Sequence, residues 1–230
     1  DPAFTGGDPA GKAAAVGDFA ATGGARGDTE EVALVLDQLK GGPAWWQFAF
    51  VTGLGDGLRR GGSLPAKNVA TLISKPPAPL AEKVGALQRV IDGAEAIAMN
   101  PKNAAAERLA ALPLVQQQGI DKVLPLAENL IAQTEPAEIQ AAACQMLSKF
   151  DRAKVADFFF ARWKTLGPTP LREALTLIAA SPSTAVPLME KMKAGEINPA
   201  LMPPMQKWVY GRSKDEKVKA LAIELFGQAT

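Results

Sequence analysis

Apolar side chains recur every three or four residues through most of the second half of the chain, which is the spacing of one face of an α-helix. The clearest stretch runs from Pro136 to Gly195. Asp151 can cap a helix inside this stretch, and Gly167 followed by Pro168 can end one, because glycine permits a left-handed stop and proline cannot continue a helix. The pattern predicts two consecutive helical hairpins, whose short loops require antiparallel helices. The apolar positions of the first helix are Ile139, Ala142, Ala143, Met146, Leu147 and Phe150.

A long polar residue, followed three positions later by a small or apolar one, recurs at the start of the first helix of the predicted hairpins. These polar residues are Arg108, Gln140, Arg172 and Lys219. The first three are spaced by 32 residues, and the last follows after 47. This irregular period fits HEAT-type repeats better than tetratricopeptide or ankyrin arrays, whose signature residues are missing. We therefore predict an all-α fold, a right-handed α-α superhelix of the HEAT/ARM-like solenoid kind built from antiparallel helix pairs. Amphipathic helices in an ordinary bundle are the alternative.

The N-terminal part of the chain is rich in glycine, with 14 of the 21 glycines at or before Gly62. Residues 12–21 predict a short, weak helix. Asp28 and Glu31 form a capping box, in which the aspartate accepts from a first-turn amide and the glutamate reaches back. Another short helix is predicted from Ser63 to Ile73.

The clearest boundary is the Pro-rich connector of residues 74–79, which is stiff because of its prolines. We therefore predict an N-terminal Gly-rich helical part, 1–75, and a part with regular HEAT-like repeats, 76–230, that together form one continuous solenoid. Beyond the connector, helices are predicted at 80–99, 103–112, 120–131, 198–210 and 214–227, besides those of the two hairpins.

Composition narrows the chemistry of the chain. Its 25 basic and 24 acidic side chains argue against a nucleic-acid binder. It has no histidine and a single cysteine, Cys144, so we expect no metal site, no haem ligation and no cofactor. The usual general base is also missing, which argues against an enzyme. No run of about 18 apolar residues exists, so no direct membrane insertion is expected. Cys144 lies beside an apolar stripe and is predicted to be a small buried filler.

Two glycine motifs resemble phosphate-binding signatures. Gly6, Gly11 and Lys12 have the spacing of a phosphate loop, but Ala13 stands where a Ser or Thr would hold Mg²⁺. The segment at 53–57, Gly-Leu-Gly-Asp-Gly, resembles the start of a dinucleotide fingerprint, yet no strand precedes it. We interpret the first motif as chance and the second as a place of close helix packing or a kink.

Several segments of the chain carry a family likeness. They are 171–175, 181–188, 193–197 and 218–227 in the C-terminal half, and 45–47 and 53–60 upstream. These segments resemble the HEAT-like helical portion of large exported proteins from planctomycete-type bacteria. The resemblance implies a position between a β-propeller of the sugar-dehydrogenase kind and a c-type cytochrome domain, and an exported (periplasmic or cell-envelope) location. It carries over no catalytic residue, and the haem motif Cys-x-x-Cys-His is absent from this chain.

The first hypothesis for function is a non-catalytic HEAT-repeat scaffold that spaces or docks the propeller and cytochrome domains of a larger protein. Because the chain begins at Asp1 without Met, we expect a fragment or a mature form. An autonomous peptide- or protein-binding solenoid without redox context is the second hypothesis, and a helical-fold enzyme the third. The partners expected are adjacent domains or other proteins. The predicted docking face lies on the last helix and consists of Lys214, Lys217, Lys219, Ala220 and Ile223.

Overall fold

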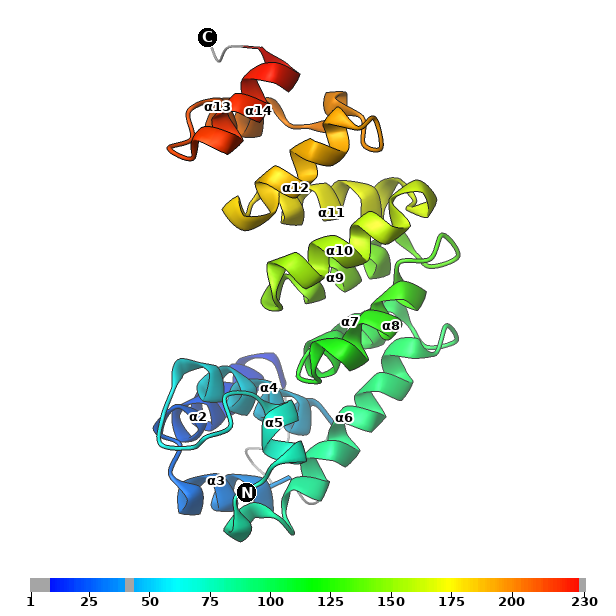
Figure 1. Cartoon of the computed structure of the whole chain (residues 1–230). Coiled ribbons are helices and arrows are strands. Elements are labelled where there is room, and N and C mark those ends of the chain that lie inside the picture. Colours follow the sequence, from blue (N-terminus) through cyan, green and yellow to red (C-terminus); the bar gives the residue numbers. More distant parts are fainter. Residues whose placement is uncertain (1–8, 40–43, 228–230) are drawn as a thin grey trace. The chain divides into compact units, whose positions relative to one another are not determined.

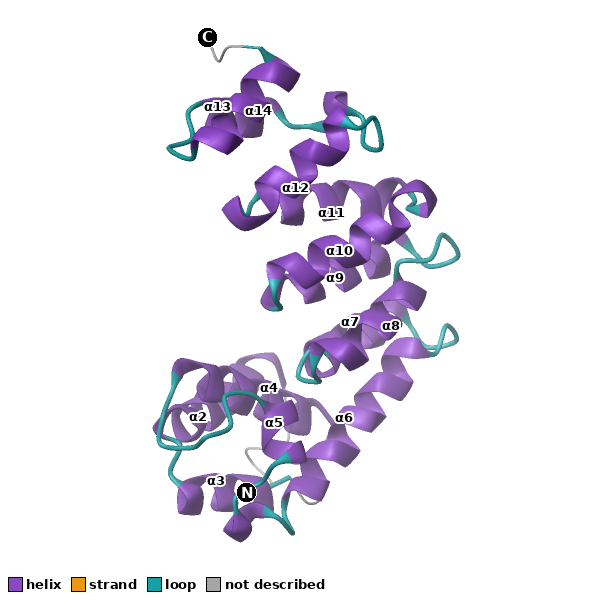
Figure 2. Cartoon of the chain, in the orientation of Figure 1, coloured by secondary structure: helices purple, strands orange, loops and turns teal. Residues whose placement is uncertain are grey.

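The computed structural model describes residues 9–39 and 44–227. Within these ranges the chain forms only α-helices, short 3-10 helices and loops (Figures 1 and 2), which confirms the predicted all-α class. The chain divides into two compact units, Asp1–Leu126 and Ala127–Thr230, and the boundary lies within one helix. The predicted division at residue 75 stays a prediction. The Pro-rich connector on which it is based lies inside the first unit.

The first unit is organised around two closely packed helices, α2 and α4. Helix α3 packs on α2 and α6, and α6 also contacts α4, α5 and α7. The helices of this unit are α2 (Pro9–Arg26), α3 (Thr29–Asp37), α4 (Ala44–Arg60), α5 (Val69–Ser74), η1 (Ala78–Leu80), α6 (Val84–Met99) and α7 (Ala105–Val115), and α8 (Ile120–Leu130) begins in it.

Glycines allow α2 and α4 to approach backbone to backbone. A Cβ atom added at Gly53 would lie 2.7 Å from the carbonyl carbon of Gly17, and one added at Gly57 would lie 2.8 Å from the amide nitrogen of Ala25. Carbon atoms normally pack at about 3.5–4.0 Å, so only glycine fits at these two positions. The predicted close packing is thereby confirmed. The packing also explains why α2 is longer than the weak helix predicted at 12–21. The glycines of α2 lower its intrinsic helix stability, and packing on α4 compensates for that loss.

Two local predictions for this unit need correction. The short helix does not begin at Ser63 but at Val69, where the Asn68 side chain accepts a hydrogen bond from the Thr71 amide. The Ser63 hydroxyl instead donates to the carbonyl of Gly27, which ties this loop to the end of α2. In the predicted capping box, Asp28 does accept from the amides of residues 30 and 31. Glu31, however, forms an ion pair with Arg26 at 3.0 Å.

In the second unit, helices contact both their neighbours along the chain and the next helix but one. Within it, α9 packs on α11 and α10 on α12, α11 also contacts α10 and α12, and α14 packs on both α12 and α13. Its helices are α9 (Ala137–Met146), η2 (Leu147–Lys149), α10 (Arg152–Arg162), η3 (Trp163–Thr165), α11 (Pro168–Ala179), α12 (Pro182–Lys193), η4 (Pro199–Leu201), α13 (Pro204–Gly211) and α14 (Glu216–Phe226). Asp151 caps α10, as predicted. Gly167 was predicted to end a helix in the left-handed conformation, but its backbone is extended (φ −69°) and it is the N-cap residue of α11, with Pro168 in the first turn.

The recurring polar residue has a structural role at two of its four positions. Arg108 is buried in α7, and its Nε donates to the carbonyl of Ala98 at 2.8 Å. Gln140 is buried in α9, and its amide donates to the carbonyls of Ala132 and Glu135 at 2.8 and 3.0 Å. Each side chain thus satisfies backbone carbonyls of the segment that precedes its own helix, where helical hydrogen bonds end.

The other two polar positions differ. Arg172 is exposed and pairs with its neighbour Glu173 at 3.3 Å. Lys219 is half-buried in α14. The sequence register is therefore shared by the four helices, but the hydrogen-bonding role is shared only by Arg108 and Gln140.

Candidate interaction surface

The predicted docking residues belong to α14 and to the loop before it. Asp215 caps α14 by accepting from the amides of residues 217 and 218. Val218 and Ala222 are buried, in agreement with the predicted inner side, and Leu221, Leu225 and Phe226 are half-buried. Ala220 and Ile223 are exposed, and Ile223 leaves 37% of its surface open to solvent.

The three lysines of the predicted face are placed differently from one another. Lys214 is exposed, and Lys219 is half-buried. Lys217 forms an ion pair with Glu190 of α12 at 2.8 Å, which neutralises part of the positive charge that we had assigned to docking. The face is thus exposed as predicted, but it is less basic than its sequence suggested.

A more apolar exposed surface lies on α13. The single helix predicted at 198–210 is instead the short η4 followed by α13, which begins at Pro204. Pro204 occupies the first turn of α13, where its missing amide hydrogen costs nothing. Met205, Trp208 and Val209 are exposed by 71%, 44% and 44%. Their spacing of three and four residues shows in the sequence that they share one side of a helix. The spacing alone does not show whether that side is buried or exposed.

The inner side of α13 is held by Tyr210. Its hydroxyl donates to the carbonyl of Ala179 at the end of α11, at 2.7 Å. Burial raises the pKa of Tyr210 to about 12, although a hydrogen bond with Gln206 works in the opposite direction. Lys207 lies with its Nζ 5.3 Å from the ring centroid of Phe226 on α14. These contacts fix which side of α13 is exposed.

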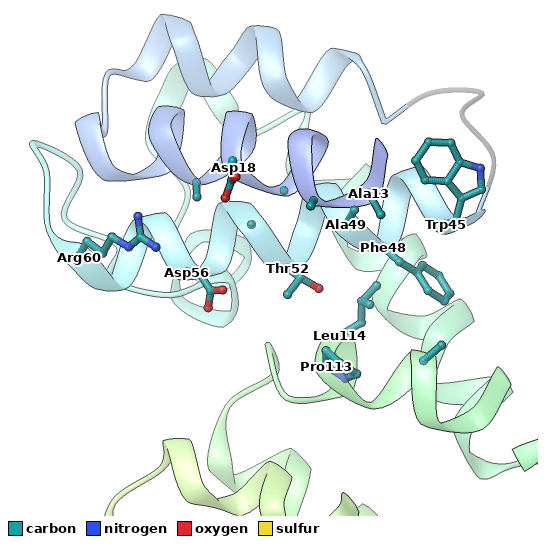
Figure 3. A pocket seen from close by; sticks show the side chains of 15 residues that line it. Ala13, Asp18, Trp45, Phe48, Ala49, Thr52, Asp56, Arg60, Pro113 and Leu114 are labelled. Carbon is teal, nitrogen blue, oxygen red and sulfur yellow. The ribbon is translucent and has the colours of Figure 1, made fainter. Parts of the chain in front are cut away.

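Unit 1 contains a groove of about 480 Å³ between α2, α4 and α7, shown in Figure 3. Small residues form its floor, with Gly17 and Ala21 from α2 and Gly53 from α4 among them. Trp45 and Phe48 lie toward one end, as Figure 3 shows. The groove therefore offers a shallow apolar channel along two closely packed helices.

The other end of the groove is charged, with Asp18, Asp56 and Arg60 on its walls. Asp56 forms an ion pair with Arg59, and Arg59 also donates to the Gln117 amide oxygen at 3.2 Å. Of the charged residues near the end of α4, Asp56 and Arg60 therefore line the groove.

The glycine motif at residues 53–57 is not built as a nucleotide site. The motif at residues 53–57 lies inside α4, where two of its glycines meet α2 and Gly55 lies against the Gln117 side chain. The motif that begins at Gly6 falls partly outside the described residues. Within the described ranges, no three His, Cys, Asp or Glu side chains gather as a metal site would require. Cys144 is fully buried, as predicted, and burial raises the pKa of its thiol to about 12.

Comparison with known proteins gives no relative. No protein-family model matches the chain, and no curated protein or solved structure shows significant similarity to it. Among the described helices, none is both long enough and apolar enough to cross a bilayer.

Proposed function

We propose that the chain is a non-catalytic helical-repeat module that docks or spaces protein domains, with its C-terminal hairpin, α13 and α14, as the docking end. The observation that carries the proposal is the uncovered apolar surface of this hairpin. In a stack of helical repeats, the last pair needs a polar outer side unless another element covers it. Here Ile223 on α14, together with Met205 and Trp208 on α13, is exposed instead.

The packing of the second unit supports the repeat interpretation. Its helices contact their neighbours along the chain, α10 with α11 and α11 with α12, and also the next helix but one, α9 with α11 and α10 with α12. This is the neighbour-to-neighbour contact expected of a HEAT/ARM-like solenoid, and we propose that class for the chain. The buried roles of Arg108 and Gln140 support the same interpretation.

The identity of the docked domains is proposed from the sequence resemblance alone. It would make them a propeller dehydrogenase and a c-type cytochrome of a larger exported protein. The docking face on α14 would then consist of Ala220 and Ile223 at its centre. Lys214, Lys217 and Lys219 would lie at its edge, where charges orient a partner more than they bind it.

The test uses the complete gene product that contains this chain, as wild type and as Ile223→Glu. Leu34→Glu is the matched control, because Leu34 is also an exposed leucine-sized side chain (66%) but lies on α3. We expect Ile223→Glu to make the domains tumble more independently in small-angle scattering and NMR relaxation, and Leu34→Glu to leave them unchanged. Unchanged tumbling for Ile223→Glu would contradict docking through α14, and a gene product without further domains would contradict docking within one polypeptide.

The groove in the first unit favours a second candidate, an autonomous peptide-binding module without redox context. Grooves that bind ligands combine apolar walls with a few polar groups, and this one has aromatic side chains at one end and Asp18, Asp56 and Arg60 at the other. The gene product separates the two candidates, because a Cys-x-x-Cys-His motif and a propeller in the same polypeptide belong only to the first.

A further inference from the structure

The exposed side of α13 has the residue types that dominate binding energy in protein interfaces. Trp, Met and Arg are enriched at interfaces, and Trp and Arg are the commonest hot-spot residues. Met205, Trp208 and Val209 fall at i, i+3 and i+4 of α13, which places them on one side of the helix, and Arg212, the residue that follows α13, lies over the Trp208 ring. We define these four residues as the α13 stripe.

The α13 stripe points away from the rest of its unit. At 3.6 residues per turn, Tyr210 lies on the opposite side of the helix from the centre of the stripe. Tyr210 is buried and bonded to Ala179, while Lys207 is half-buried and faces the Phe226 ring. Because those contacts hold the inner side, the stripe is presented to solvent by the fold and not by fraying of a terminal helix.

The segment that carries the stripe has basic side chains and no acidic ones. From Asn198 to Lys214 the chain contains Lys207, Arg212 and Lys214 and no Asp or Glu. Within the described residues, none of these three cations forms an ion pair with a carboxylate. The nearest acids in sequence are Asp215, which is occupied in capping α14, and Glu216 in its first turn. Lys207 faces Phe226 on the inner side of α13, so the exposed surface is apolar at its centre and has Arg212 and Lys214 as its cations.

Arg212 is held over Trp208. Its guanidinium carbon lies 4.6 Å from the centroid of the Trp208 ring, within the range of a cation–π contact. Because this contact already restricts the Arg212 side chain, binding of a partner costs less side-chain entropy. A partner carboxylate can thus pair with Arg212 while apolar side chains of the same partner cover Trp208 and Met205.

We propose that the α13 stripe binds an acidic amphipathic helix, with leucine-like side chains on one face and glutamate or aspartate beside them. A helix is the expected occupant because helices pack on helices throughout this unit, as α13 does on α14. Charge complementarity selects an acidic helix over a basic one. This inference rests on the proposed docking function, and it names a second surface of the hairpin and the chemistry of its partner.

A bilayer surface fits these observations less well. Amphipathic helices that lie in a membrane interface bury a broad apolar face, whereas the large exposed apolar side chains of α13 are limited to Met205, Trp208 and Val209. Arg212 also covers one face of Trp208, so the indole could enter the acyl region only by losing that contact or by taking a charge with it.

The experiment measures binding of a fluorescently labelled synthetic helix, made of Leu at i, i+3, i+4 and i+7 with Glu at the other positions, to the whole 230-residue chain. We expect Trp208→Ala to weaken binding by about 30-fold, the loss typical of a truncated hot-spot side chain. Arg212→Glu is expected to weaken it by about tenfold and to reduce its salt dependence. Leu34→Ala is the control that leaves binding unchanged. A peptide with Lys in place of every Glu is expected to prefer Arg212→Glu over the wild type.

Circular dichroism confirms that each variant is folded, and Met205→Ser replaces Trp208→Ala if that variant is not. Failure of the acidic peptide to bind the wild type, or equal binding by Arg212→Glu, would overturn the proposal. So would tighter binding to phosphatidylserine-containing vesicles than to the peptide. If the peptide experiment contradicts the proposal while Ile223→Glu still separates the domains of the gene product, only the α13 proposal is wrong. If Ile223→Glu also leaves the domains unchanged, the docking function is wrong as well.

Discussion

The contact between α2 and α4 can be tested by a single methyl group. Gly57 lies inside α4, and a Cβ atom there would be 2.8 Å from the Ala25 amide nitrogen and 2.9 Å from the Ala21 carbonyl carbon. Both atoms belong to the backbone of α2, which cannot rotate away as a side chain can. The Gly57→Ala substitution therefore forces the two helices apart by roughly 0.5–1 Å to restore normal contact distances.

The magnitude follows from two opposing effects. Overpacking of a tight interface costs about 1–3 kcal/mol, and a backbone obstacle points to the upper end of that range. Alanine in a helix interior gains about 1 kcal/mol over glycine. The free energy of unfolding should thus fall by about 2 kcal/mol for Gly57→Ala. Gly93→Ala in α6 is the matched control, because nothing lies within 4 Å of its added Cβ, and it should gain about 0.5–1 kcal/mol.

Urea unfolding followed by tryptophan fluorescence measures both variants. Trp45 and Trp46 belong to α4 itself and report on the first unit. Trp163 and Trp208 belong to the second unit, so both are replaced by Phe in every variant, and the midpoint then follows the first unit with its α2–α4 contact. Equal midpoints for Gly57→Ala and Gly93→Ala, or a higher midpoint for Gly57→Ala, would refute the close approach of these helices.

Two further predictions concern the second unit. Leu175→Asp removes a buried side chain (5% exposed) and buries a charge, so it should lower the free energy of unfolding by at least about 2–5 kcal/mol. Glu190→Ala, on the surface, should change it by about 0.5 kcal/mol or less. Thermal melts measure both variants, and similar melting temperatures would contradict the helix register. Tyr210→Phe should cost about 1 kcal/mol at neutral pH by losing the hydrogen bond to Ala179. Because the pKa of Tyr210 is raised, from 10.0 to about 12, its contribution is complete below pH 10 and is lost as pH rises from 10 through 12. Tyr210→Phe should therefore make stability fall less steeply across that range, and an unchanged alkaline slope would show that the hydroxyl is not buried.

The local pattern of the sequence determined the helices of the second unit and most of their ends. Apolar spacing, the Asp151 cap and the Gly167–Pro168 break are signals carried by neighbouring residues, and helix formation responds to neighbours first. The burial of Cys144 and of Leu175 followed from the same stripes. Ser63 shows the limit of this reasoning, because its hydroxyl bonds to Gly27, 36 residues earlier in the chain.

Tertiary structure alone decided which way each stripe faces and what each glycine meets. Gly57 and Gly93 look alike in sequence, each a glycine within a helix, yet one touches the backbone of α2 and the other touches nothing. The stripe at Met205 and Trp208 has the spacing of a buried helix face, but Tyr210 occupies the side of α13 that meets the rest of the unit. Periodicity fixes which residues share a face. Which face is buried depends on contacts between segments far apart in the chain, and a single sequence does not contain those contacts in readable form.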